Sequence, residues 1–199
     1  MTARYPKAVK PNYALNMVNV FAMPIGQPKL ADDDWFVTSV DMKNGTYTLL
    51  HSGVPGDGLA RVVTVTVTGD AVDSGDTLGT VTINGTDVNG SLLSEEVIPS
   101  LGVETTEAAF LHVTSVVGAG WAATGGTDHI KVGFGASIGM TSDFYPAATS
   151  IVIMALVDGI TTAFTQSIGG SVATWTVDAS GGTYDGSKFL TLLIARGQD

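Results

Sequence analysis

The sequence predicts an all-β protein, with a β-sandwich or jelly-roll-like body of about a dozen short antiparallel strands behind an extended N-terminal arm. Short runs rich in valine and threonine alternate with turns of glycine, aspartate and asparagine along most of the 199 residues. Several runs show the two-residue period of a strand, and no segment shows a convincing amphipathic helical pattern. Strands at this regular spacing are typical of sandwiches and barrels.

Residues 1 to 31 are expected to form the arm, and residues 32 to 199 the sandwich body. The arm has no acidic residue, whereas the body holds all 19 acidic residues of the chain. Two interpretations fit this asymmetry: the arm docks on a neighbouring acidic surface, such as that of the next subunit, or it is a solvated tail. The basic residues of the arm are Arg4, Lys7, Lys10 and Lys29, and its prolines are Pro6, Pro11, Pro24 and Pro28.

The first strands are expected on either side of a polar turn. Tyr13–Met23 has enough apolar content to be helix or strand, and we interpret it as extended. The strands Trp35–Val40 and Thr46–Leu50 are predicted to form a hairpin across Lys43–Gly45. The glycine-rich segment His51–Leu59 that follows is predicted to be a loop.

The middle of the chain shows the clearest alternation. In Arg61–Gly69 valines and threonines alternate, which predicts a half-buried antiparallel strand with the valines on one face. Thr80–Gly90 repeats the alternation and contains Asn-Gly twice, at Asn84 and Asn89. Both pairs are interpreted as turns, because Asn and Gly adopt positive φ at low cost. Ser91–Ile98 resumes the strand pattern.

Further strands follow at similar spacing to the end of the chain. Turns such as Asp158-Gly159 separate them, and the loop of residues 118 to 126 contains Trp121. The predicted strands are Glu107–Val117, Asp128–Phe134, Ser150–Val157, Ile160–Thr165, Ala173–Val177 and Phe189–Ala195.

The composition of the chain excludes or disfavours several classes of function. The chain has no cysteine, which excludes disulfides and thiolate catalysis, and its net charge of −10 disfavours nucleic-acid binding. No apolar run approaches the roughly 18 to 20 residues of a membrane-spanning helix. Prolines near the N-terminus do not fit a signal peptide, so we expect a soluble protein made in a cytosol.

Signatures of catalysis and metal binding are weak. His51, His112 and His129 lack the spacing of a zinc motif, and no Gly-x-Ser-x-Gly signature is present. The acidic loop with Asp70, Asp73 and Asp76 is either a solvated turn or a source of calcium ligands. We expect a protein that is not an enzyme and has no cofactor. The tryptophans offer a sugar-binding platform or, alternatively, packing in the core and at interfaces: Trp35, Trp121 and Trp175.

Seven segments, in this order and spacing, resemble auxiliary virion proteins of tailed bacteriophages. They cover much of residues 60 to 195: Arg61–Thr68, Gly79–Gly90, Glu95–Ile98, Ala109–Val116, Asp128–Gly135, Ile153–Gly159 and Tyr184–Leu190. The resemblance implies a structural component of the head, most like a capsid decoration or cement protein. Such proteins sit on the outside of the shell and lock neighbouring capsomers together, commonly as trimers.

The expected function is therefore attachment to the outer surface of a phage capsid. The expected partners are the major capsid protein and further copies of the chain, as a homotrimer, without nucleic acid or membrane. The protein would be made in the host cytoplasm and reside on the virion. Two alternatives remain: a neck or tail structural protein, or a carbohydrate- or receptor-binding module. The candidate partner-binding residues are Arg4, Lys7, Lys10, Lys29, Trp35 and Trp121.

Overall fold

The computed structural model describes residues 19–69, 76–123, 128–140, 150–182 and 184–196, and it confirms the all-β, sandwich-like fold. Within these residues the strands are β1 Asn19–Gly26, β2 Asp32–Asp41, β3 Gly45–Thr46, β4 Arg61–Gly69, β5 Thr80–Thr86, β6 Leu92–Val97, β7 Gly102–Phe110, β8 His112–Ala119, β9 Asp128–Gly139, β10 Ser150–Val157, β11 Ile160–Thr162, β12 Thr165–Ser167, β13 Thr176–Asp178 and β14 Leu190–Arg196. None of the helices among the described residues is long and apolar enough to cross a membrane.

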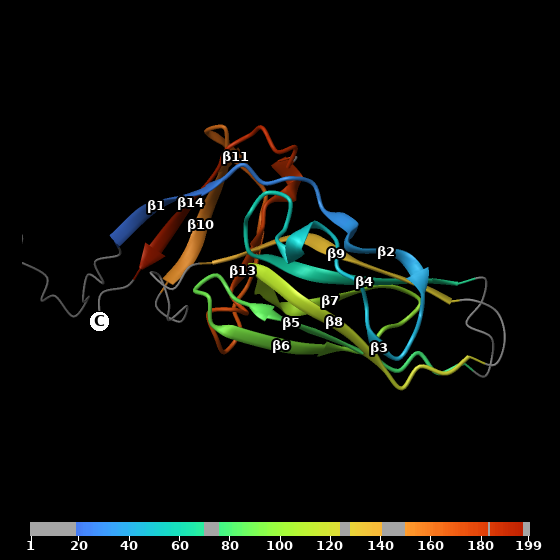
Figure 1. The fold of residues 1–199 in the computed structure, drawn as a ribbon. Helices are drawn as coiled ribbons and strands as arrows, with labels where there is room; N and C mark the ends of the chain where they lie inside the picture. The colour runs from blue at the N-terminus through green and yellow to red at the C-terminus, as the bar shows by residue number, and fades with distance from the viewer. Residues whose placement is uncertain (1–18, 70–75, 124–127, 141–149, 183, 197–199) are drawn as a thin grey trace, which may run out of the picture.

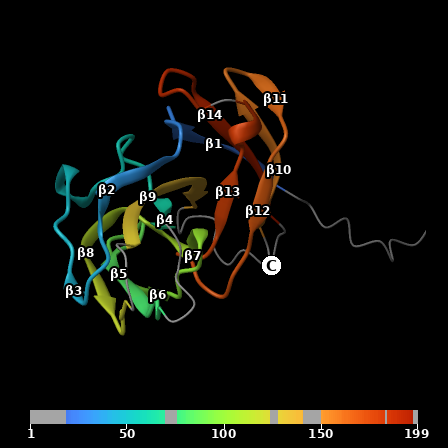
Figure 2. The ribbon, with the colours of Figure 1, turned by 90° about the vertical axis from the view of Figure 1, so that its right-hand side faces the viewer.

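The strands form three antiparallel sheets (Figures 1 and 2). The terminal sheet has the order β1-β14-β10-β11. The central sheet has the order β12-β13-β9-β4-β7, with β2 also paired to β9, and the third sheet has the order β3-β8-β5-β6. Figure 2 shows the terminal sheet on one side of the molecule and the third sheet on the other.

Two hydrophobic cores hold the sheets together. The first lies between the central and third sheets and includes Val65 of β4 and Ile83 of β5, both fully buried. The second lies against the terminal sheet and includes Trp175 and Leu192. The long strand β9 serves both cores, because Phe134 belongs to the first and Ile138 to the second.

Strand β4 has the predicted bounds, but both of its faces are buried. The valine face packs into the first core as predicted. The threonine face was expected to be solvated, yet Thr64 and Thr66 are only 7% and 6% exposed. Because β4 lies between β9 and β7 in the central sheet, neighbouring side chains cover its short threonines. The prediction of a half-buried strand is therefore wrong.

The predicted hairpin of residues 35 to 50 does not form. Strand β2 pairs with β9 instead, with Val37 opposite Val132. Strand β3 is only two residues long and pairs with β8, so the segment belongs to two different sheets. The predicted turn at Lys43–Gly45 is therefore the point where the chain passes from one sheet to another. A local turn signal does not decide whether the flanking strands pair with each other or with strands distant in the sequence.

Two other predicted strands are each divided between sheets. The run Glu107–Val117 becomes β7 in the central sheet and β8 in the third sheet, with a break at Leu111, whose N–H donates to the carbonyl of Thr86. The run Ile160–Thr165 becomes β11 in the terminal sheet and the start of β12 in the central sheet. Such changes of sheet let one chain enclose two cores.

One of the two Asn-Gly pairs forms the predicted turn, and the other does not. Asn89-Gly90 lies in the turn between β5 and β6, with Gly90 at φ +79°. Gly85 instead lies inside β5, where an added Cβ would be 2.0 Å from the carbonyl oxygen of His112 on β8. Glycine is needed there for close backbone approach. The turn prediction for Asn84-Gly85 is therefore wrong.

Part of the expected arm belongs to the body. Strand β1 pairs along its length with the last strand, β14, from Asn19 opposite Arg196 to Gly26 opposite Leu190. Residues 19–26 are extended, as interpreted, but they form the edge strand of the terminal sheet rather than a free arm. Residues 1–18, with most of the predicted arm, lie outside the described residues.

Arg61 lies where the two cores meet. Its guanidinium carbon is 5.5 Å from the ring centroid of Phe134 in the first core and 5.4 Å from that of Tyr184 in the second. The side chain is fully buried and forms an ion pair with the equally buried Asp57. It also donates to three backbone carbonyls at 2.8 to 3.1 Å, those of Lys29, Gly135 and Ala136.

Tyr184 makes the stability of the second core depend on pH. Burial raises the pKa of its hydroxyl to about 12, and the hydroxyl oxygen accepts a hydrogen bond from Ala179 N–H at 2.7 Å. The unfolded side chain titrates near pH 10, so this stabilisation is complete below about pH 10 and is lost as the pH rises to about 12. We expect the free energy of unfolding to decline more steeply in the wild type than in Tyr184→Phe across this range. Urea unfolding at pH 8 to 11.5 measures this, and parallel declines would contradict it.

Candidate interaction surfaces

The predicted partner-binding residues do not form one described surface. Arg4, Lys7 and Lys10 lie outside the described residues. The backbone of Lys29 is part of the Arg61 site: its N–H donates to Asp57 Oδ2 at 3.1 Å, and its carbonyl accepts from Arg61 at 2.8 Å. Its exposed side chain remains open to partners, but the residue also has a structural role that the sequence did not indicate.

Trp35 is held by the loop of residues 51 to 56. Its Nε1 donates to the carbonyl of Val54 at 2.7 Å, and its ring stacks on His51 with a centroid distance of 4.0 Å. The ring also meets Phe134 edge-on at 5.9 Å. Trp35 therefore anchors a loop to the first core, and little of its ring is available as a platform.

Trp121 is fixed by Asn44 from the loop before β3. The Asn44 amide donates to the Trp121 carbonyl at 3.0 Å, while its oxygen accepts from the Trp121 N–H at 2.9 Å. The indole is partly buried against the first core. The contacts of Trp35 and Trp121 are with different segments, so the structure does not show the two rings sharing one binding platform.

The described titratable residues do not assemble a convincing metal or catalytic centre. Asp32, Asp33 and Asp34 form a cluster with carboxylate oxygens within 4.8 Å of one another. Asp33 already pairs with Lys131 at 3.1 Å, and the Asp32 side chain raises the pKa of Asp34 by hydrogen bonding to it. Asp70 and Asp73 of the proposed calcium loop lie outside the described residues.

The three histidines contact different groups. His51 stacks on Trp35, and the Nε2 of His112 lies 2.8 Å from the carbonyl of Ser52. His129 lies 3.2 Å from Asp41. Each contact is adequate to explain a structural histidine on or near the surface.

The terminal sheet presents an exposed apolar face. Register places Val20, Ala195 and Ile151 in one row across β1, β14 and β10. The next row, with Ile194 and Val152, points into the second core. Val20 and Ile151 are 55% and 47% exposed, which places the first row on the opposite, outward side. By the same alternation, this mainly apolar face carries Val20, Ala22, Pro24, Ile151, Met154, Leu156 and Leu193, together with the polar Thr191 and the buried Ala195.

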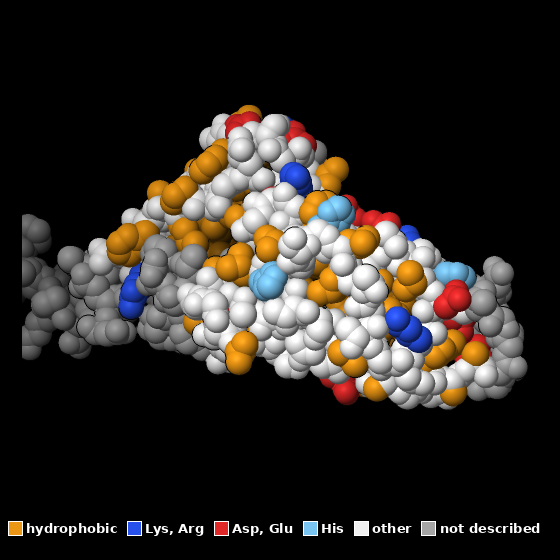
Figure 3. Space-filling model, viewed as in Figure 1, with side chains coloured by type: hydrophobic (Ala, Val, Ile, Leu, Met, Phe, Trp, Pro, Cys, Tyr) orange, Lys and Arg blue, Asp and Glu red, His pale blue; other side chains and the backbone are white. Residues whose placement is uncertain are grey.

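The apolar face has almost no charge. Arg196 is the only charged residue among the four strands of the terminal sheet. Hydrophobic side chains gather along the slope formed by β1, β14 and β10 (Figure 3). Antiparallel sheets with one solvated face normally carry polar residues on it, and a contiguous apolar patch commonly marks an interaction site. The near-continuous apolar runs of residues 151–157 and 192–195 were the available sequence signal for this face.

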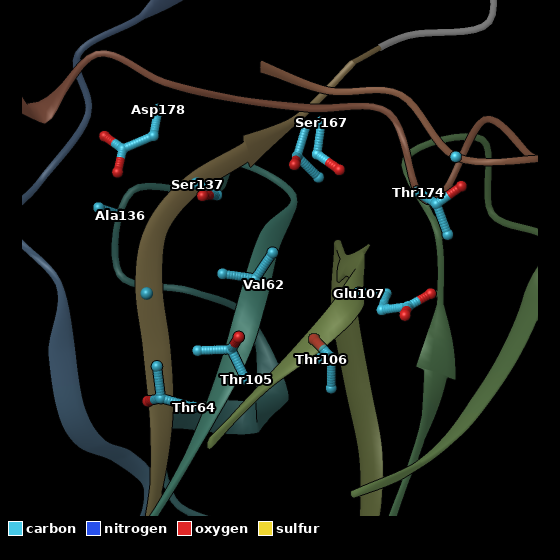
Figure 4. Close-up of a pocket in the computed structure, with 13 residues that line it drawn as sticks. Val62, Thr64, Thr105, Thr106, Glu107, Ala136, Ser137, Ser167, Thr174 and Asp178 are labelled. Carbon is cyan, nitrogen blue, oxygen red and sulfur yellow. The ribbon is translucent and has the colours of Figure 1, made fainter. Parts of the chain in front are cut away.

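A polar groove of about 620 Å³ lies on the threonine face of the central sheet (Figure 4). It is bounded by β4, β7 and β9 and by the segment of residues 167–178. Glu107 and Asp178 lie on opposite sides of the groove in Figure 4. The hydroxyl-bearing residues along it are Thr64 and Thr106, whose hydroxyls are buried, and Thr105, Ser137, Ser167, Thr174 and Thr176.

Many of the polar groups in the groove are unused within the described part of the chain. The side chains of Thr105, Ser137, Ser167 and Thr176 have no hydrogen-bond partner there, and neither does the Glu107 carboxylate. Asp178 uses one oxygen, which accepts from Ser180 N–H at 2.7 Å. The groove therefore offers several free donors and acceptors to a ligand.

The chain matches no known family model, and no curated protein or solved structure is significantly similar to it.

Proposed function

We propose that this chain is a non-enzymatic structural protein of a tailed-bacteriophage virion, which binds the outer surface of the capsid and stabilises contacts between capsomers. The apolar face of the terminal sheet is the observation that carries the proposal. A face of this kind is suited to burial against another protein, because it leaves almost no charge without a partner. The acidic remainder of the body favours a single, oriented mode of attachment.

The attachment needs more than the apolar face. Strands of seven or eight residues at the spacing of a sheet give β1, β14 and β10 a combined area on the order of 400 Å², whereas a stable interface buries about 800 Å² on each partner. Contacts between neighbouring copies of the chain on the shell are a natural source of further binding. Linked weak contacts add up to firm binding, and binding only the assembled shell stabilises that assembly by mass action.

One segment that carries the resemblance to auxiliary virion proteins contributes to this surface. Ile153–Gly159, one of the segments that carries the resemblance, covers the second half of β10 and its turn. The sugar-binding alternative receives less support, because Trp121 is half-buried and tied to Asn44.

Charging the apolar face is expected to weaken attachment. In Val20→Lys/Ile151→Lys, two half-exposed apolar residues of one row become charged. Each buried aliphatic side chain stabilises an interface by on the order of 1 kcal/mol, so we expect at least a tenfold loss of affinity. Co-sedimentation with purified capsids that lack this protein measures the affinity.

The matched control adds the same charges elsewhere. Leu101→Lys/Val103→Lys replaces residues that are 59% and 58% exposed at the central sheet, and it should bind like the wild type. Equal binding by both double variants would exclude the apolar face as the attachment surface.

The location and copy number of the chain in purified particles test the proposal as a whole. Copies spread over the shell would support capsid decoration. Copies confined to one vertex would assign the chain to the neck or tail, and absence from particles would overturn a virion role.

A further inference from the structure

The groove on the central sheet has a chemistry opposite to that of the apolar face. It has a volume of about 620 Å³, and its walls carry free hydroxyl groups. Thr105 comes from β7, Ser137 from β9 and Ser167 from β12, so three strands contribute hydrogen-bonding groups (Figure 4). Such an array suits a ligand with repeated donors and acceptors, as the backbone of an extended peptide provides.

The charge of the groove selects for cations. None of its lining residues is basic, whereas Glu107 and Asp178 are acidic. A third carboxylate lies close by, because Glu95 accepts from the N–H groups of Glu107 and Ala108 at 2.6 and 3.0 Å. Glu107 and Asp178, on the two sides of the groove, would repel an anionic ligand. Each of them could form an ion pair with a basic ligand.

The N-terminal segment has the complementary chemistry. Residues 1–12 contain Arg4, Lys7 and Lys10 and no acidic residue. The three bases recur at every third residue. We propose that the groove binds the chain's own N-terminal segment, residues 1–12, through ion pairs to Glu107 and Asp178 and hydrogen bonds from the groove hydroxyls to its backbone.

Residues 13–18 connect the segment to β1, and six extended residues span up to about 20 Å. This proposal does not depend on attachment to a capsid and is tested in its absence, so its failure leaves the proposed function untouched.

A labelled peptide of residues 1–12 provides the first test. The receptor is the full chain with Arg4→Gln, Lys7→Gln and Lys10→Gln, which removes competition from its own segment. We expect saturable binding by fluorescence anisotropy that weakens with salt. Adding Glu107→Gln/Asp178→Asn should weaken binding roughly tenfold, since each exposed ion pair contributes up to about a factor of five.

The matched control carries the same charge change outside the groove. Asp41→Asn/Glu96→Gln replaces two exposed carboxylates and should bind the peptide like the receptor with the intact groove. Absence of binding, or equal weakening in both double variants, would overturn the proposal. Urea unfolding confirms that the groove variant remains folded.

The intact chain gives an independent readout. A photo-crosslinking residue at Lys7 should form crosslinks to peptides that contain Glu107 or Ser167–Asp178. Crosslinks mainly to other parts of the body would contradict the assignment.

Discussion

Replacing Arg61 by methionine is expected to destabilise the protein by about 3 to 5 kcal/mol, because it leaves the buried carboxylate of Asp57 without its cationic partner. Methionine fills part of the volume but supplies no donors. The carbonyls of Gly135 and Ala136, which accept from Arg61 at 3.1 and 2.8 Å, also lose their guanidinium partner. Urea unfolding monitored by tryptophan fluorescence measures the loss.

Two further variants separate burial from charge. Asp57→Asn leaves Arg61 charged and buried, and we expect a loss of similar size. Lys131→Met breaks the ion pair with Asp33. The Lys131 and Asp33 side chains are 27% and 52% exposed, so this variant should lower the free energy of unfolding by less than about 1 kcal/mol. A loss below about 1 kcal/mol in Arg61→Met would show that the buried pair does not hold the two cores together.

Trp175→Ala is expected to cost about 3 to 5 kcal/mol, the typical effect of removing a large aromatic side chain from a core. Trp175 is fully buried and is the largest side chain of the second core. Its backbone carbonyl accepts from Met140 N–H at 2.9 Å, so the segment that follows β9 is tied to it. Thermal and urea unfolding measure the effect.

Trp175→Phe is the matched control. The indole Nε1 is buried without a hydrogen-bond partner among the described residues. Phenylalanine removes this unsatisfied donor and keeps an aromatic ring, so the expected loss is much smaller than for alanine. Equal losses in the two variants would mean that the site depends on the indole itself rather than on filled volume.

Local signals in the sequence were sufficient for several elements. Arg61–Gly69 and Ser150–Val157 have the predicted bounds, because alternation or a sustained β-branched run defines a strand without reference to its partner. Asp158-Gly159 forms the predicted turn between β10 and β11, with φ of 49° and 77°. Positive φ at both positions is what a tight hairpin requires.

Pairing between strands was not predictable from these signals. The run from Glu107 to Val117 has no turn residue, yet it changes sheet at Leu111. Asn84-Gly85 carries a turn signal but lies in β5, where Asn84 bonds to Ser115 and Ser94 on the two neighbouring strands. In both cases the outcome depends on partners distant in the sequence.

The candidate surfaces were harder to predict than the fold. The apolar face is assembled from both ends of the described chain, so no window of sequence contains it. Lys29 was selected for its charge, yet its backbone supports the buried Arg61 site. The groove is lined by serine and threonine, residues that also mark ordinary strands and turns, and only the fold shows that their hydroxyls converge.

Because β1 pairs with β14, the terminal sheet cannot be completed until the end of the chain has been synthesised. At roughly 5 to 20 residues per second, a ribosome makes β14 on the order of 10 to 30 seconds after β1. Until then β1 lacks its partner strand, and the row of Val20, Ala195 and Ile151 does not exist. The apolar face of the terminal sheet is thus completed only after almost all of the chain from β1 to β14 has been made.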